Sequence, residues 1–323
     1  MKNTFKFSAR ATAAAAVLAL GSSAFAVTFD SNIEMDSYYR SGSNVEEADK
    51  GMNQSGRVEF NISGKAGADM FVAGRATLLA LKNGAAATDD MWIQMGSAKG
   101  DVKLGRFEAA DLFPIANDAQ VGHAGAVYYG NDLRGRKSSN VFHAAGTANL
   151  GNGLSLELGV VQSNQYVVVD GVRVGEAKGV RPVLSYAAGA LNVSVGLESG
   201  KFDNGSTLSG AGATIGYNFG AVKLTGNLAS GKTDVATGPN SKSAYALIAT
   251  AGGLAVGLIA GNQDNGSVQD KVQTGYVAYT MPLFDIKGAS MTPAFSTSKF
   301  TAGAGSAGNL NEDTFKLRFD YSF

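Results

Sequence analysis

The sequence has few of the residues that build redox, metal and nucleophile sites. Among its 323 residues there is no cysteine, and there are two histidines and five prolines. Without cysteine the chain can form no disulfide framework, no thiolate zinc site and no cysteine nucleophile. Two histidines also argue against a multi-histidine metal centre. No cofactor is therefore expected.

Charge is sparse and balanced. Lys and Arg number 27, as do Asp and Glu, and charged residues make up 17% of the chain, below the usual share of about 25%. Nucleic-acid-binding domains normally carry a basic excess, so this balance argues against that class. Glycine accounts for 43 positions and hydrophobic residues for 45%. Such a chain can bury a large core, which excludes intrinsic disorder.

The first 26 residues have the layout of a secretory signal peptide. A basic start with Lys2, Lys6 and Arg10 precedes the apolar run 11–20, and an A-x-A cleavage site follows at 24–26. The apolar run is shorter than the roughly 20 residues that span a bilayer. We therefore predict a cleaved leader at 1–26 and one domain at 27–323. An exported chain of this size without cysteine favours a Gram-negative envelope.

Apolar and polar residues alternate through the rest of the chain. At the C-terminus Phe315, Leu317, Phe319, Tyr321 and Phe323 alternate with polar residues. This period of two is typical of a strand with one apolar and one polar face. The same pattern predicts strands near 27–39, 56–65, 68–81, 89–98, 100–107, 138–149, 153–164, 179–187, 190–200, 209–219, 221–230, 242–251, 253–262, 270–281, 290–299 and 312–323.

These sixteen predicted strands are joined alternately by short turns and long polar loops. The turn at 282–289 is longer than the other short ones, and the loop at 108–137 is the longest of all. An even strand count with this alternation is the layout of a transmembrane β-barrel. The predicted fold is thus all-β, a 16-stranded antiparallel barrel with short periplasmic turns. Both termini lie on the short-turn side, so the first and last strands can pair and leave no open edge.

The apolar faces are expected to point outward into lipid. Aromatic residues gather at the short-turn ends of strands, where they would form an interfacial girdle: Tyr186, Tyr217, Phe219, Tyr279, Tyr321 and Phe323. Against this, the uncharged stretch 243–261 with its GxxxG repeat also fits a transmembrane helix. The strand interpretation divides it at 252–253 and places Leu247, Ala255 and Ile259 on an apolar inner face.

With this layout the chain resembles the Gram-negative general diffusion porins. The matching segments are 55–60, 102–107, 136–142 and the terminal Phe323. The resemblance implies a homotrimer in the outer membrane, in contact with its lipid and lipopolysaccharide. It also implies that the third loop folds into the lumen and narrows the pore. A final Phe on an alternating strand resembles the signal read by the outer-membrane assembly machinery.

The same resemblance directs attention to charges on and near the third loop. Family porins place loop acids opposite basic residues of the wall. The usual Pro-Glu-Phe-Gly-Gly run of that loop is missing here, and 112–114 is its nearest counterpart. By parity Arg57, Arg75 and Lys103 face inward, and Arg106 does so only if Gly105 bulges its strand. The predicted constriction comprises Arg57, Arg75, Lys103, Arg106, Glu108, Asp111, Asp118, Asp132 and Arg136.

The predicted function is passive diffusion of small hydrophilic solutes and ions through a water-filled channel. Charge rings and pore width would set its selectivity. The alternative is a substrate-specific, sugar-type porin, for which Trp92, Tyr128, Tyr129 and Tyr166 could line an aromatic slide. No enzyme is expected, because His143 is too far along its strand from Ser138 and Ser139 for a nucleophile–base pair, and no G-x-S-x-G elbow occurs.

Overall fold

The computed structural model describes residues 26–115, 124, 127–136, 141–163, 177–202, 205–235, 238–264, 268–303 and 308–323. The predicted leader lies outside the described residues except for Ala26, at which the first strand begins. Within the described part, sixteen long strands, one two-residue strand and the short 3-10 helix η1 (Glu47–Asp49) follow one another. The strands are β1 (Ala26–Ser41), β2 (Gly51–Ala66), β3 (Met70–Leu81), β4 (Ala86–Ser97), β5 (Gly100–Arg106), β6 (Val141–Gly151), β7 (Leu154–Ser163), β8 (Ala177–Ala188), β9 (Leu191–Phe202), β10 (Thr207–Asn218), β11 (Lys223–Val235), β12 (Gly238–Ala251), β13 (Leu254–Asp264), β14 (Gln269–Tyr279), β15 (Met281–Pro282), β16 (Ala289–Thr301) and β17 (Leu310–Ser322).

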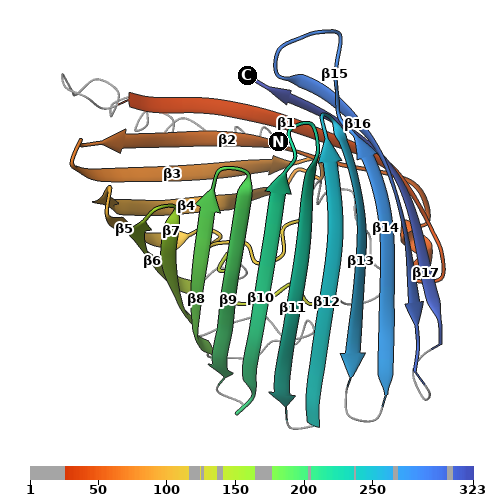
Figure 1. The fold of residues 1–323 in the computed structure, drawn as a ribbon. Helices are drawn as coiled ribbons and strands as arrows, with labels where there is room; N and C mark the ends of the chain where they lie inside the picture. Colours follow the sequence, from red (N-terminus) through yellow and green to blue (C-terminus); the bar gives the residue numbers. More distant parts are fainter. Residues whose placement is uncertain are drawn as a thin grey trace, which may run out of the picture.

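The strands form one closed antiparallel sheet. Each long strand pairs with its neighbours in the sequence, and β1 also pairs with β17, from Asn32 opposite Ser322 to Ser41 opposite Asp313. The strands curve around a common interior in Figure 1, with β1 running beside β17. Closure removes the unpaired strand edges that would otherwise expose backbone donors and acceptors. The predicted 16-stranded antiparallel barrel is confirmed.

All sixteen predicted strands are present, but several extend further toward the long loops. β2 begins at Gly51 rather than near 56, and β12 begins at Gly238 rather than near 242. Apart from Met52 and Pro239 these extensions consist of glycine and polar residues, so they carry no apolar alternation to mark them. The β11–β12 hairpin continues its pairing to Val235 opposite Gly238, where the sequence predicts a loop.

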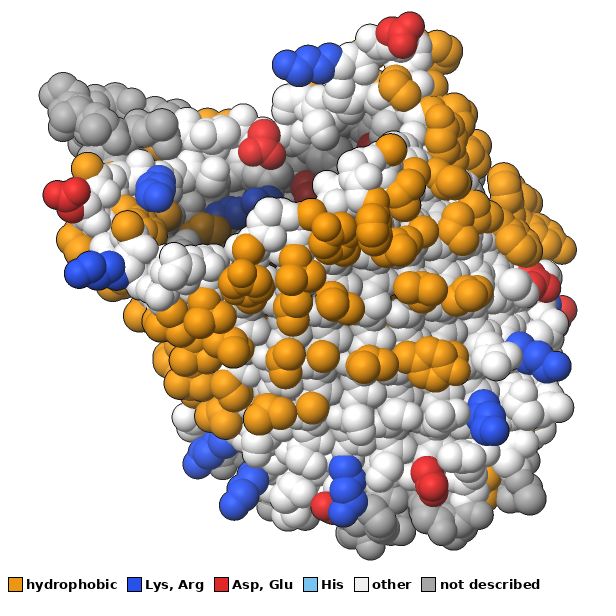
Figure 2. All heavy atoms as spheres, in the orientation of Figure 1, with side chains coloured by type: hydrophobic (Ala, Val, Ile, Leu, Met, Phe, Trp, Pro, Cys, Tyr) orange, Lys and Arg blue, Asp and Glu red, His pale blue; other side chains and the backbone are white. Residues whose placement is uncertain are grey.

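The outer face of the barrel is apolar. Large hydrophobic side chains on alternate positions are exposed, among them Phe60, Leu158, Leu197, Leu228 and Leu258. In Figure 2 they form a band across the visible face, and Lys and Arg gather toward the edge where the long loops lie. Soluble monomers rarely expose an apolar patch above a few hundred Å². The predicted girdle aromatics are all exposed at the short-turn ends of their strands: Tyr186, Tyr217, Phe219, Tyr279, Tyr321 and Phe323.

The helix interpretation of 243–261 is wrong. This stretch forms parts of β12 and β13, which pair from Ser241 opposite Asp264 to Ala251 opposite Leu254. Among the described residues, we find no helix with the length and hydropathy needed to traverse a bilayer. The inner-face prediction for this hairpin is right for the buried Ala255 and Ile259 and wrong for Leu247, which is exposed. The register pairs Leu247 with Leu258 on the outer face, because the inward residues of β12 are the even-numbered ones.

The turn after β14 is longer than the other short turns, as predicted. Its first residues, Met281 and Pro282, form β15 and pair with Met291 and Ser290 of β16. The shorter turns rely on glycine instead. At Gly153, which has φ of +80°, a side chain would overlap the carbonyl oxygen of Ala187. Only glycine fits this left-handed and closely approached position without strain.

Candidate pore constriction

The described parts of the third loop lie against the inner wall of the barrel. Phe113 and Tyr128 of the loop share one buried cluster with Ile248, Ile259 and Tyr276 of β12, β13 and β14. Along their strands, these wall residues alternate with the exposed apolar residues of the outer face, so they point inward. The loop therefore covers the apolar inner surface of β11–β14, which explains why a barrel with a polar interior carries isoleucine and alanine there.

Hydrogen bonds from wall side chains fix the outgoing half of the loop. Thr214 of β10 donates to the carbonyl oxygen of Leu112 (2.9 Å), and the Asn227 amide of β11 donates to that of Pro114 (2.7 Å). Further round the wall, the Ala124 backbone N–H donates to Ser298 Oγ of β16 (2.9 Å). Each bond satisfies a loop backbone group that is removed from water.

A buried ion pair holds the returning half. Arg181 Nε of β8 lies 3.7 Å from Glu198 Oε2 of β9, and the two side chains are 1% and 0% exposed. The Glu198 carboxylate accepts the Tyr128 hydroxyl (2.8 Å) and the backbone N–H groups of Asp132 (3.1 Å) and Leu133 (2.5 Å). Burial, followed by the Glu198 charge, raises the pKa of Tyr128 well above its ordinary value. The phenol thus stays a donor.

The partner arginine binds the same loop segment. Arg181 Nη2 donates to Asn131 Oδ1 (2.8 Å) and to the Gly130 carbonyl oxygen (3.3 Å). Glycines of the neighbouring strand β10, where Gly210 pairs with Glu198, make room for loop side chains. A β-carbon at Gly210 would overlap the Tyr128 hydroxyl, and one at Gly212 would lie 2.7 Å from Leu112 Cβ. The wall is therefore shaped to receive the loop.

A second charge cluster joins the two ends of the loop. Arg134 Nη1 lies 3.0 Å from Glu108 and 3.6 Å from Asp111. Its Nε donates to the carbonyl oxygen of Ala109 (2.8 Å), and the Ala109 N–H donates to the Arg134 carbonyl oxygen (2.9 Å). Two of the predicted loop acids, Glu108 and Asp111, are thus partly neutralised by an arginine of the loop itself.

Arg136 connects this cluster to the wall. Its guanidinium lies 3.3 Å from Glu108 and 2.9 and 3.2 Å from Asp89 and Asp90 of β4. Burial alone would lower the pKa of Arg136, but these three carboxylates outweigh it and raise the pKa. The residue has a φ of +63°, a conformation that costs a side-chain-bearing residue energy and persists where its surroundings fix it.

The inner wall of β1, β2 and β17 carries a dense set of alternating charges. Arg318 pairs with Asp36 (2.7 Å) and Glu34 (2.9 Å). Arg57 lies 2.8 Å from Glu59 and 3.5 Å from Glu34. Although Arg57 is on the inner face, its side chain is 43% exposed. It therefore borders solvent-filled space inside the barrel.

Arg75 of β3 contacts both neighbouring strands. It donates to Asn61 Oδ1 of β2 (2.8 Å) and lies 3.9 Å from Asp90 of β4. Its side chain is 39% exposed, so this guanidinium also borders the interior space. Arg57 and Arg75, both predicted from parity, thus stand on the side of the barrel that the described loop residues leave open.

The other predicted residues have different surroundings. Lys103 projects inward, as predicted, with its Nζ 4.6 Å from the Trp92 ring centre. The β4–β5 register runs through Gly105 without a shift, and it pairs Arg106 with the outward Met91. Arg106 Nε donates to the carbonyl oxygen of Thr88 (3.0 Å), so no register bulge turns it into the lumen.

Two predicted loop acids complete the set. Asp132 belongs to the segment that is held through its backbone N–H on Glu198. Asp118 lies outside the described residues, as do His123, Ser138, Ser139 and Tyr166.

His143 of β6, the other histidine, is buried, and its ring stacks on that of Phe107 with 4.0 Å between the ring centres.

The sequence reasoning missed the residues that anchor the loop. Arg181 and Glu198 face inward by the same parity that located Arg57, but strand parity cannot show that two charges meet the third loop. Asp89, Asp90 and Arg134 were also missed, although Asp89 and Asp90 mark the start of a predicted strand. The sequence did contain a signal for them: two adjacent acids, Asp89 and Asp90, at a strand end, and two arginines, Arg134 and Arg136, in the third loop.

Comparison with known proteins identifies the fold. The sequence matches no protein-family model, and no curated protein sequence matches it. Among solved structures, the anion-selective porin from Comamonas acidovorans matches with a TM-score of 0.66 and 17% identity, over 93% of this chain and 100% of that one. The trimer form of OmpT, an outer membrane protein of Vibrio cholerae, matches with a TM-score of 0.67 and 12% identity, over 93% and 100%.

A mutant of Rh. blastica porin gives a TM-score of 0.61 at 15% identity, over 92% of this chain and 100% of that one. The class that the architecture defines is therefore the closed antiparallel barrel of outer-membrane porins. At these identities the similarity establishes the fold.

Proposed function

We propose that residues 27–323 form an outer-membrane porin, a water-filled channel through which small hydrophilic solutes and ions diffuse passively. Residues 1–26 would be the cleaved leader that exports it from a Gram-negative cytoplasm. One observation carries the proposal: a closed barrel exposes its apolar residues outward, while charged residues such as Arg57 and Arg75 border solvent inside. That distribution is the reverse of a soluble barrel and matches a lipid-embedded channel.

The constriction would lie between the third loop and the wall of β1–β5. The side chains of Arg57 and Arg75 are 43% and 39% exposed although each lies near a carboxylate of the wall, whereas Glu108 and Asp111 share Arg134 of the loop. A passing solute would therefore meet these exposed wall arginines together with the carboxylates beside them. Fixed charges of this kind orient polar solutes and set ion preference.

Assembly as a homotrimer is part of the same proposal. The Vibrio cholerae OmpT structure, which matches over 93% of this chain, is a trimer form. A barrel with an outward apolar band needs lipid, lipopolysaccharide or another protomer around it.

The substrate-specific alternative requires aromatic side chains that are free to contact a sugar. Tyr128 is buried with its hydroxyl on Glu198, and Tyr129 packs against Phe113 at 5.0 Å between ring centres. Trp92 packs beneath Lys103. These contacts use the aromatic faces for loop packing, so general diffusion is the function that the geometry favours.

Liposome swelling tests the proposal. Proteoliposomes containing the mature chain would be diluted into solutions of uncharged sugars of increasing size. We expect swelling rates that fall smoothly with solute size and do not saturate with concentration. Absence of swelling by protein shown to be folded would contradict the proposal, and saturation by one sugar would favour the substrate-specific alternative.

A further inference from the structure

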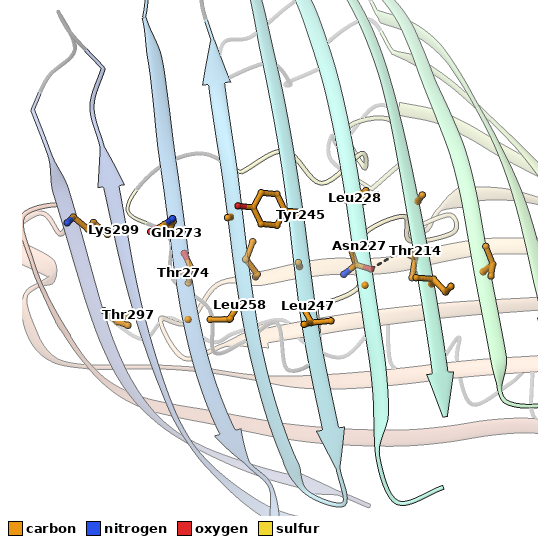
Figure 3. Close-up of a pocket in the computed structure, with 18 residues that line it drawn as sticks. Thr214, Asn227, Leu228, Tyr245, Leu247, Leu258, Gln273, Thr274, Thr297 and Lys299 are labelled. Carbon is orange, nitrogen blue, oxygen red and sulfur yellow. Dashed lines mark hydrogen bonds between the residues drawn. The ribbon is translucent and has the colours of Figure 1, made fainter. Parts of the chain in front are cut away.

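A small pocket lies inside the barrel, beneath the base of the third loop. It has a volume of about 260 Å³ and is lined by inward residues of β4–β7, by 107–111 and by Arg134. At about 30 Å³ per water it holds one small solute. A hollow of about 900 Å³ on the outer face, shown in Figure 3, differs because exposed residues such as Leu247 and Leu258 line it. A hydrophilic solute crossing the barrel can reach the inner one, which we call the loop-base pocket.

The strand register arranges the wall of the loop-base pocket in two rows of inward side chains. The row nearer the loop places a lysine between two uncharged neighbours: Gln94, Lys103 and Ala145. The row nearer the short turns has an acid at each end: Asp101, Thr147 and Glu157. The two rows are two residues apart along each strand, about 6.6 Å. The small side chains of Ala145 and Thr147 leave the space between the charges open.

Two opposite charges in this pocket have no ionic partner. Lys103 Nζ lies 4.6 Å from the ring centre of Trp92 and 5.2 Å from that of Phe107. Attraction to these ring faces holds the ammonium group in place. In the part of the chain that the structure describes, no carboxylate pairs with Lys103, and the Asp101 carboxylate forms no ion pair or side-chain hydrogen bond. Both groups are therefore available to a solute.

The remaining charges of the pocket are already engaged with the loop. Glu108 and Asp111 share Arg134, and Glu157 Oε1 accepts the Ala110 N–H (2.9 Å). The lining thus contains four carboxylates and two cationic groups: Asp101, Glu108, Asp111 and Glu157 with Lys103 and Arg134. A solute that carries only a negative charge would be repelled by this excess of carboxylates. One that carries only a positive charge would leave the lysine unpaired.

We propose that the loop-base pocket binds a small zwitterionic solute, of the class of the free α-amino acids, as it passes through the barrel. The solute carboxylate would contact Lys103, its ammonium group would contact Asp101, and a short side chain would lie over Ala145 and Thr147. The inference rests on the proposed channel function and adds a solute class to it. An uncharged sugar would form neither ionic contact, so its diffusion stays unsaturable.

Saturation-transfer NMR on the detergent-solubilised mature protein tests the charge requirement. Alanine, propionate and isopropylamine share a three-carbon skeleton and carry both charges, only the negative one and only the positive one. Alanine is expected to reach half-saturation at a concentration about tenfold lower than either analogue, because it forms one more charge-assisted hydrogen bond. Equal half-saturation for the three solutes, or tighter binding of either analogue, would overturn the proposal.

Variants locate the binding. Lys103→Met and Asp101→Asn are each expected to raise the half-saturation concentration of alanine about tenfold, since each loses one charged contact. Thr147→Leu fills the pocket without changing its charge and is expected to weaken alanine binding as well. Lys99→Met and Asp69→Asn are the matched controls, because both residues are exposed on short turns outside the pocket. They should bind alanine like the wild type.

Ion conductance of the same preparations reports on the channel separately. If folded Lys103→Met, Asp101→Asn and Thr147→Leu all bind alanine like the wild type, the loop-base pocket is not the binding site and the proposal fails. A wild-type protein that conducts ions but binds alanine no better than its analogues would reject the pocket alone. Absent conductance in the wild type would instead contradict the proposed function.

Discussion

Replacement of Glu198 by alanine tests how the third loop is held against the barrel wall. The carboxylate accepts three hydrogen bonds from the returning half of the loop, from Tyr128, Asp132 and Leu133. It also balances Arg181, which is equally buried. The variant would remove every one of these interactions and leave the arginine charge without its partner.

The magnitude follows from burial. Removing one member of a buried ion pair costs about 3–5 kcal/mol. The lost hydrogen bonds join the loop to the wall. Most of this free energy is therefore lost from the equilibrium between the docked and the undocked loop. Even about 3 kcal/mol changes an equilibrium constant by more than a hundredfold. We therefore expect the open-channel current of Glu198→Ala to be larger than that of the wild type and to fluctuate between levels.

Single-channel recording in planar bilayers measures both effects. Glu157→Ala serves as the control, because Glu157 is an inward carboxylate of β7 that accepts a hydrogen bond from the Ala110 N–H (2.9 Å) at the other end of the loop. The double variant Arg181→Met, Glu198→Leu also loses the hydrogen bonds from the loop to Glu198, but it leaves no buried arginine without a partner. It therefore separates the effect of the lost loop contacts from that of the unpaired Arg181 charge. If Glu198→Ala folds, yet its current and noise equal those of the wild type, Glu198 does not hold the loop against the wall.

Three further predictions concern the lumen, the loop seat and the outer face. Replacing Arg57 and Arg75 by serine should shift the reversal potential in a salt gradient toward cation preference, and an unchanged potential would remove them from the constriction. Gly210→Val should displace Tyr128 and enlarge the single-channel current, because its side chain would overlap the Tyr128 hydroxyl. Leu247→Arg should destabilise the barrel in lipid by about 2–4 kcal/mol, as measured by urea unfolding in vesicles, since it places a charge on the lipid face.

Matched variants sharpen two of these tests. Gly216→Ala is the control for Gly210→Val, because the nearest atom to its new β-carbon is the Lys223 Cε at 3.6 Å. Thr250→Arg is the control for Leu247→Arg, since Thr250 lies on the even-numbered inner face of the same strand. Equal destabilisation by both arginines would show that the two faces are not distinguished by lipid.

The fold could be predicted because strand periodicity is a local property. Phe315 to Phe323 reveals one strand without reference to any other, and repetition of the pattern gives the strand count and closure. Strand ends were less accurate at Gly51 and Gly238, where the hairpins continue with polar residues and no lipid face imposes alternation. Leu247 was assigned to the wrong face because an almost continuous apolar run hides its period.

The site was only partly predictable, because it depends on where a long loop docks. Parity located Arg57 and Arg75, whose surroundings belong to adjacent strands. It could not locate the contact between Glu198 and Leu133, whose positions are 65 residues apart. Nor could it show that Glu108 and Asp111 meet Arg134, since the loop has no periodicity from which its path could be derived.

Conductance of the purified mature chain in a planar bilayer, under a salt gradient, tests the central claim most directly. We predict large, long-lived current steps with mild ion selectivity, which three coupled protomers would deliver in groups of three. Folded protein that inserts into the bilayer and passes no current would contradict the claim that this barrel encloses an open, water-filled channel.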